Sequence, residues 1–105
     1  MVEYEAGEKV GDKGYLVLRG ELVGDVSDRQ LAKEIEHHYV DDGVRQIVVD
    51  LSDVDEISLE GVAILLRLLE ESQRRGKRFG VEHPHDQVRE KLALTGLLGL
   101  LTESP

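Results

Sequence analysis

The run at residues 47–51, Ile-Val-Val-Asp-Leu, constrains the fold more than any other stretch, because its apolar residues are consecutive rather than alternating. Consecutive β-favouring residues are typical of a strand that is covered on both faces, in the middle of a sheet. Amphipathic helical patterns precede and follow the run. Strands separated by helices imply right-handed crossovers. The sequence therefore predicts an α/β fold, with a small mixed, mostly parallel β-sheet and helices packed on it.

Two further strands are expected before the first helix. Residues 2–6 alternate between apolar side chains and glutamate, which indicates a strand with one solvent-exposed face. The strand is expected to bend or bulge at Gly7. The turn-forming sequence Gly-Asp-Lys-Gly at 11–14 leads into the β-favouring residues 15–18. The two strands form a predicted hairpin, and the second strand is expected to end near Leu22.

The first helix is predicted between a capping box and a glycine. Ser27 and Gln30 have the spacing at which each side chain can bond the backbone amide of the other. Leu31 and Ile35 then share one face, and Gly43 is expected to end the helix. This helix is therefore amphipathic and packs on one side.

The second helix is predicted to start near Ser58 and to end in a left-handed cap at Gly76. Its apolar face comprises Val62, Leu65, Leu66 and Leu69. Its expected i, i+4 ion pairs are Glu70 with Arg74 and Glu71 with Arg75. The remaining predicted elements are a short strand at residues 78–81 and a helical region that Pro84 opens, with Val88 and Leu92 on one face.

Composition and charge limit the classes of molecule that the chain can bind. The chain has 105 residues, of which 40% are hydrophobic, and this is enough for one compact domain over residues 1–105. Its 22 acidic and 13 basic residues give a formal net charge of -9, which repels nucleic acids and anionic lipids. No apolar run reaches the roughly 18 residues of a membrane span. We expect a cytoplasmic protein that binds proteins or small ligands, with no direct membrane insertion.

Metal and thiol chemistry find no support in the sequence. There is no cysteine, which excludes disulfides, thiolate zinc sites and thiol catalysis. The adjacent residues His37 and His38 would point about 100° apart on a helix, so they cannot chelate one ion together. His83 and His85 lack a second motif at metal-site spacing. No metal, cofactor or catalytic residue is predicted.

Several blocks together resemble the STAS domain, a family that includes the bacterial anti-sigma-factor antagonists. These blocks are Leu-Arg-Gly-Glu-Leu at 18–22, Ile-Val-Val-Asp-Leu-Ser-Asp-Val at 47–54, Gly61-Val62 at the opening of an apolar helix, and Thr-Gly-Leu at 95–97. The resemblance implies a module that binds a partner rather than an enzyme. In the antagonists, a kinase-like anti-sigma factor binds the unmodified protein and can phosphorylate a serine at the start of the second helix.

The chain departs from the family at that serine. The family's switch reads Asp-Ser-Ser-Gly or Asp-Ser-Thr-Gly, and aligning its glycine with Gly61 puts Leu59 at the phosphorylated position and Glu60 at the next hydroxyl residue. Ser58 then occupies the position of the aspartate, and Val23 replaces a family aspartate near the same site. The resemblance therefore implies a degenerate phosphorylation motif.

Ser58 has two possible roles. It could be a phosphoacceptor one residue early, but Asp55, Glu56 and Glu60 would repel the phosphates of a nucleotide. The favoured interpretation is a helix cap, and Glu60 is interpreted as an acid that the helix dipole favours. The Leu59 side chain has two alternative locations: exposed on a docking face, or packed against the sheet.

The predicted partner-binding surface is the start of the second helix, with the loop after Leu22. It comprises Asp55, Glu56, Ser58, Leu59, Glu60, Val62 and, further along the helix, Arg67. The predicted partner is a histidine-kinase-like ATPase that acts as an anti-sigma factor. Two alternatives stay open: a STAS subunit of a membrane ABC-type transporter complex, and a small-molecule or nucleotide sensor with its pocket near the same helix start.

Overall fold

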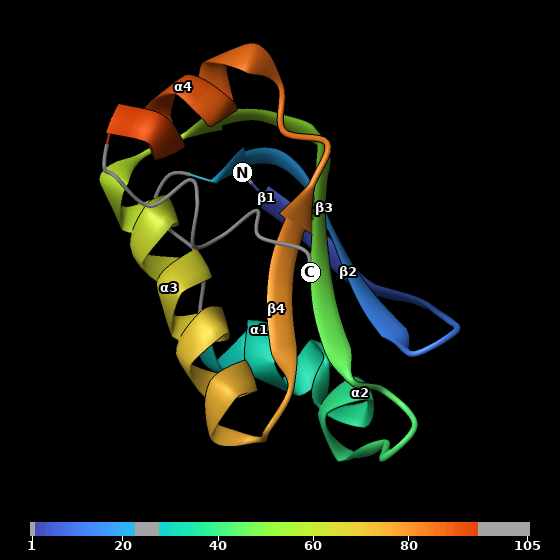
Figure 1. Ribbon diagram of the computed structural model, residues 1–105. Coiled ribbons are helices and arrows are strands. Elements are labelled where there is room, and N and C mark those ends of the chain that lie inside the picture. Colours follow the sequence, from blue (N-terminus) through green and yellow to red (C-terminus); the bar gives the residue numbers. More distant parts are fainter. Residues whose placement is uncertain (1, 23–27, 95–105) are drawn as a thin grey trace.

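The computed structural model describes residues 2–22 and 28–94, and its core is a four-stranded sheet in the order β1-β2-β3-β4 (Figure 1). The strands are β1 (Val2–Val10), β2 (Lys13–Leu22), β3 (Gln46–Ile57) and β4 (Arg78–Glu82). The β1–β2 pair is antiparallel, whereas β3 is parallel to both β2 and β4. The predicted class, α/β with a mixed and mostly parallel sheet, is confirmed.

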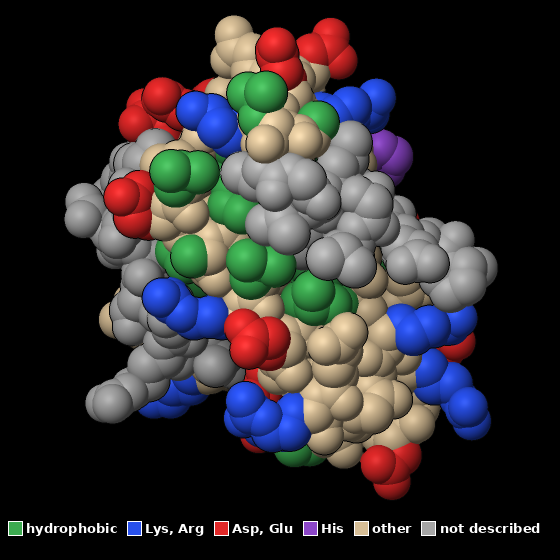
Figure 2. Space-filling model, turned by 60° about the vertical axis from the view of Figure 1, so that its left-hand side comes forward, with side chains coloured by type: hydrophobic (Ala, Val, Ile, Leu, Met, Phe, Trp, Pro, Cys, Tyr) green, Lys and Arg blue, Asp and Glu red, His purple; other side chains and the backbone are tan. Residues whose placement is uncertain are grey.

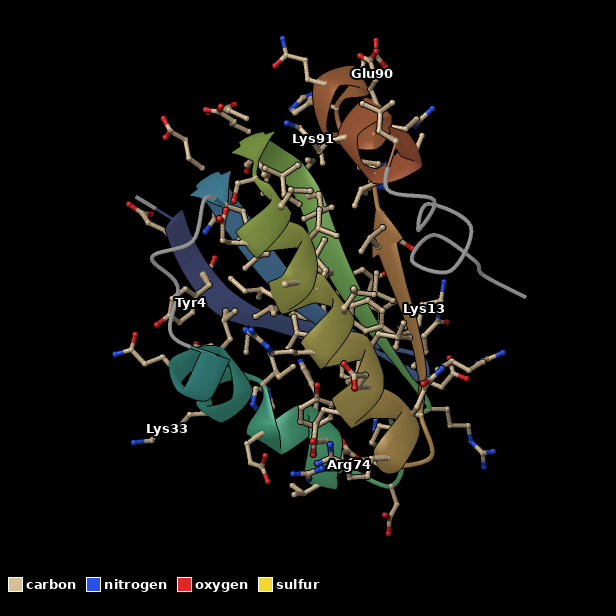
Figure 3. All side chains as sticks on the ribbon, turned by 90° about the vertical axis from the view of Figure 1, so that its left-hand side faces the viewer. Tyr4, Lys13, Lys33, Arg74, Glu90 and Lys91 are labelled. Carbon is tan, nitrogen blue, oxygen red and sulfur yellow. The ribbon has the colours of Figure 1, made fainter. Side chains whose placement is uncertain are left out.

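The helices are α1 (Asp28–Glu34), α2 (Glu36–Val40), α3 (Leu59–Arg74) and α4 (Asp86–Leu94). Figure 3 shows α3 running across one face of the sheet, with α1 and α2 beside its C-terminal half and α4 near its N-terminal end. Within the described residues, no helix is long and apolar enough to span a bilayer. The buried apolar residues of this helical face and of the sheet form one cluster.

The β1–β2 hairpin forms much as predicted. The register shifts between Ala6 and Lys9, so the strand bulges around Gly7. A Cβ atom at Gly7 would lie 3.0 Å from the Cβ of Tyr15, and glycine permits this close approach of the strands. The tight turn consists of Gly11, which has a φ of 62°, and the residue that follows it.

The central strand β3 is longer than the sequence predicted. Its neighbours are β2 and β4, so the predicted central position of residues 47–51 is confirmed. The sequence predicted a strand at residues 47–51, whereas residues 52–57 continue it to Ile57. They do so because they pair with the end of β2, where Gly20 lies opposite Val54 and Leu22 opposite Ile57. Pairing with a neighbouring strand satisfies the backbone of an otherwise polar segment.

The predicted first helix is two short helices. The break is at Ile35, which has φ -102° and ψ 9°, and its side chain is fully buried. The prediction that Gly43 ends the helix is wrong, because α2 ends at Val40 and Asp41 is extended. The Asp41 carboxylate accepts a hydrogen bond from the amide of Gly43 at 2.8 Å, which turns the chain there. Ser27 of the predicted capping box lies outside the described residues.

The α3 helix follows its predicted limits with small differences. Ser58 is its N-cap, and Gly76 has a φ of 74°, as expected of a left-handed cap. Its buried side includes Ile64 and Leu68, which the predicted apolar face omitted, whereas Leu66 and Leu69 are only partly buried. In α4, Val88 and Leu92 are buried as predicted. The apolar segment from Thr95 onward lies outside the described residues.

The two predicted ion pairs at the end of α3 are confirmed only in part. Glu71 pairs with Arg75 at 2.8 Å, as expected. Arg74 also pairs with Glu71, at 2.7 Å, and not with Glu70. Both guanidinium groups therefore converge on one carboxylate.

Candidate functional site at the start of helix α3

Ser58 caps α3 through its side chain. Its Oγ accepts a hydrogen bond from the amide of Gly61 at 3.2 Å, so the predicted cap is confirmed. Hydrogen bonding by the Ser58 side chain, and secondarily by the backbone amide of Glu60 itself, lowers the pKa of the Glu60 carboxyl group below its ordinary value.

The first turn of α3 lies directly against the end of β2. The amide of Ser58 donates a hydrogen bond to the carbonyl oxygen of Leu22 at 3.0 Å. A Cβ atom at Gly61 would collide with that oxygen and would lie 2.8 Å from Cγ1 of Ile57. Gly61 is needed here because only a hydrogen atom fits between the helix and the strand. The start of α3 is thus held rigidly between the last residues of β2 and β3.

Leu59 projects from this rigid turn into solvent. Its relative exposure is 68%, which settles the open alternative in favour of exposure over packing against the sheet. Asp55, Glu56 and Glu60 are also exposed, and they place carboxylates around the leucine. Figure 2 shows hydrophobic side chains gathered on the face that carries α3, with charged groups at their margin. On this rigid turn the leucine is available to add apolar area to a contact with another molecule.

Two of the predicted site residues lie elsewhere. Val62 is only 3% exposed and belongs to the core, so its place in the predicted contact surface is wrong. It lies on the buried side of α3 with Leu65 and Leu68. Residues 59 and 62 are only about 60° apart around the helix axis, but Leu59 is the first residue of the helix and remains exposed there. Arg67 is exposed but lies two turns further along, about 12 Å from Leu59 along the helix axis.

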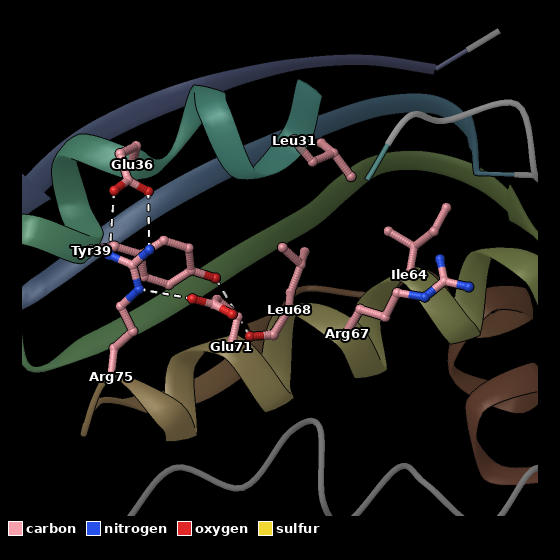
Figure 4. A pocket seen from close by; sticks show the side chains of 8 residues that line it. All are labelled: Leu31, Glu36, Tyr39, Ile64, Arg67, Leu68, Glu71 and Arg75. Carbon is pink, nitrogen blue, oxygen red and sulfur yellow. Dashed lines mark hydrogen bonds and ion pairs between the residues drawn. The ribbon is translucent and has the colours of Figure 1, made fainter. Parts of the chain in front are cut away.

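Arg67 instead lines a pocket between α3 and the α1–α2 pair, here called the α2–α3 pocket (Figure 4). The pocket has a volume of about 180 Å³. Its lining residues are Leu31, Glu36, Tyr39, Ile64, Arg67, Leu68, Glu71 and Arg75. The sequence predicted a possible sensor pocket near the start of α3, whereas this pocket lies along its middle and C-terminal half.

One end of the α2–α3 pocket is a compact ionic cluster. The Arg75 guanidinium lies over the ring of Tyr39, 4.9 Å from its centroid, and pairs with both Glu71 and Glu36. Burial raises the pKa of Tyr39, and the bond from Arg75 lowers the pKa of Glu71. Sequence periodicity pointed to the pair within α3 but not to Glu36, which is 39 residues away in the chain.

The histidines have structural roles or lie on the surface. His38 is buried, and its Nε2 lies 3.0 Å from the carbonyl oxygen of Gly7. Because a carbonyl only accepts, the ring carries a hydrogen on Nε2. His83 is exposed, with a φ of 58°. Over residues 2–22 and 28–94, no three histidine, cysteine or acidic side chains are grouped so that they could hold a metal ion.

The sheet order, the capped α3 and its close contact with β2 define a STAS-type domain. A family model described as "Mlab, STAS domain" matches residues 6–102, which is nearly the whole chain. The chain therefore belongs to the STAS domain family. No curated protein sequence matches it significantly.

Solved structures support the fold. The anti-sigma factor antagonist SpoIIAA in its unphosphorylated form matches with a TM-score of 0.70 at 17% identity, over 98% of this chain and 89% of that chain. A Thermotoga maritima protein described as a candidate anti-sigma factor antagonist matches with a TM-score of 0.72 at 23% identity, over 95% and 82%. The murine anion transporter Slc26a9 matches with a TM-score of 0.71 at 16% identity, over 86% of this chain but only 15% of that chain. The fold is thus shared by antagonist-like proteins and by one part of a transporter.

Proposed function

We propose that this chain is a cytoplasmic regulatory module that docks the start of α3 on a protein partner, in the manner of an anti-sigma-factor antagonist, and that it does so without a serine phosphorylation switch. The proposed partner is a histidine-kinase-like ATPase that acts as an anti-sigma factor. The contact surface comprises Asp55, Glu56, Ser58, Leu59 and Glu60. Such a module acts by occupying a surface of its partner, so it performs no catalysis and uses no cofactor.

The exposed Leu59 is the observation that carries this proposal. A leucine that is 68% exposed on a rigid helix turn contributes apolar area to a contact at little entropic cost. Carboxylates surround it, which matches the polar rim and apolar centre of a protein interface. The shared fold with SpoIIAA, itself an anti-sigma factor antagonist, supports the partner class.

The state of Ser58 supports the loss of the switch. Its hydroxyl oxygen accepts a hydrogen bond from the amide of Gly61, so a transferred phosphate would disturb this cap bond. It would also stand beside the Glu60 carboxylate, and like charges at this distance repel. The position that matches the family's phosphorylated serine is Leu59, which has no hydroxyl group.

A direct test incubates the chain with the candidate ATPase and ATP, and measures both complex formation and intact mass. A stable complex without added phosphate is the expected result. A stoichiometric phosphate that disappears in Ser58→Ala would refute the claim that the switch is lost. Failure to bind any such ATPase would refute the antagonist assignment.

A second candidate function is a STAS subunit of an ABC-type transporter complex. It is favoured by the match of this fold to part of the transporter Slc26a9, and by the "Mlab" description of the family model. In that case the same helix start would bind a nucleotide-hydrolysing transporter subunit. Co-purification with each type of ATPase distinguishes the two functions, because only one of them should form a complex that survives gel filtration.

A further inference from the structure

We infer that the α2–α3 pocket is a binding site for a small carboxylate that carries one ring-sized apolar group. The site lies along the middle and C-terminal half of α3, away from the proposed docking surface at residues 55–60. It is therefore independent of the proposed function.

The size and floor of the pocket suit a single ring. Its volume of about 180 Å³ is slightly larger than an apolar cavity of about 150 Å³ that can hold benzene. Leu31, Ile64 and Leu68 supply buried aliphatic side chains to its lining. A ligand with one aromatic ring is therefore matched in size to this pocket and can lay the ring over its aliphatic side chains.

The two carboxylates of the pocket are already engaged. Arg75 donates to both oxygens of Glu36, at 3.3 and 3.4 Å, and to Oε2 of Glu71 at 2.8 Å. Arg74 donates to the other oxygen of Glu71 at 2.7 Å. All four carboxylate oxygens thus accept from a guanidinium. The negative charge of both carboxylates is thus paired with guanidinium groups, so they attract a cationic ligand less strongly than unpaired carboxylates would.

Arg67 supplies the group that recognises the ligand's carboxylate. In Figure 4 it lies at the opposite end of the pocket from Arg75, next to Ile64, with Leu68 between the two arginines. A guanidinium has five donor hydrogens, so Arg67 can bind a ligand in addition to its contacts within the chain. Arginine can bind a carboxylate through two parallel hydrogen bonds. The ligand's ring would then lie over the aliphatic floor, with its carboxylate at the exposed rim.

The experiment follows the δ1-methyl signal of Ile64 by NMR while a probe is added. The chain has four isoleucines, and among them only Ile64 lines the pocket, so its signal reports on this site. The probes are phenylacetate, 2-phenylethylamine and 2-phenylethanol, which share a ring and differ in charge. Ligands of this size bind in the millimolar range, so each is titrated to about 20 mM.

We expect phenylacetate to shift the Ile64 signal saturably and to bind about fivefold more tightly than the amine. Arg67→Gln should weaken phenylacetate binding about fivefold, to the level of the neutral alcohol. The control Arg89→Gln removes the same charge from the exposed side of α4 and should leave binding unchanged. Equal binding of the amine, no effect of Arg67→Gln, or no response of Ile64 to phenylacetate would each overturn the inference.

Discussion

The carbonyl oxygen of Leu22, at the end of β2, accepts a hydrogen bond from the amide of Ser58 at 3.0 Å. This bond joins the end of β2 to the start of α3 at the candidate site. The same oxygen lies where a side chain at residue 61 would have to be. The position of the α3 start, and hence of Leu59, therefore depends on this contact between strand and helix.

The absence of a side chain at Gly61 is expected to be essential for stability. Alanine normally favours a helix over glycine, but here its methyl group would meet a backbone oxygen and Ile57, neither of which can move freely. We expect Gly61→Ala to lower the free energy of unfolding by about 2 kcal/mol, measured by urea denaturation. The comparison variant Gly76→Ala has open space around it and should cost only about 1 kcal/mol, from its positive φ. A more stable Gly61→Ala protein would contradict this account.

The cap at Ser58 should contribute measurably to stability. Ser58→Ala leaves the amide of Gly61 without its side-chain acceptor, and we expect a loss of about 1 kcal/mol in thermal or chemical denaturation. Ser58→Asn keeps an acceptor at the same place and should recover most of the loss. An equal loss in both variants would show that the cap bond is not the cause.

The hydrogen bond from Ser58 predicts a specific pH dependence for Glu60. Its pKa is lowered in the folded protein, so its ionised form stabilises the fold above the unfolded value of 4.5, and this stabilisation is lost as the pH falls through the lower folded value. The difference in stability between the wild type and Glu60→Gln should therefore shrink below pH 4.5.

NMR titration of the Glu60 carboxyl group provides the direct measurement. We expect its pKa to lie below 4.5 in the wild type and to rise in Ser58→Ala, because the largest cause of the shift is the bond to the serine hydroxyl. An unchanged pKa in Ser58→Ala would assign the shift to the backbone amide instead.

Leu59 should matter for binding and not for folding. Because its side chain is largely exposed, Leu59→Ser should change the free energy of unfolding by less than about 0.5 kcal/mol. The same substitution should weaken the complex with the partner about tenfold in a titration calorimetry experiment. Leu94→Ser is the matched control, since Leu94 is 79% exposed on α4. Equal effects of the two substitutions on the complex would place the contact elsewhere.

Local patterns predicted much of the fold. The consecutive apolar residues at 47–51 predicted the central strand. Ser58 and Gly76 predicted the two limits of α3. These features succeed because capping and burial on both faces depend on neighbouring residues, and neighbours are visible in the sequence. The resemblance to the STAS family also rested on such blocks, and the family model confirms it.

The site required the tertiary structure. The sequence left Leu59 undecided and assigned Val62 both to the apolar face of the helix and to the contact surface, because only the packing of α3 against the sheet shows which side chains are buried. The extension of β3 to Ile57 depends on its pairing with β2, and the bonds from Arg75 to Glu36 join residues 39 positions apart. The sequence by itself thus determined the strands, the limits of α3 and the family, since these follow from local contacts. The tertiary structure decided which side chains face solvent and which meet at the pocket, since these depend on contacts between distant segments.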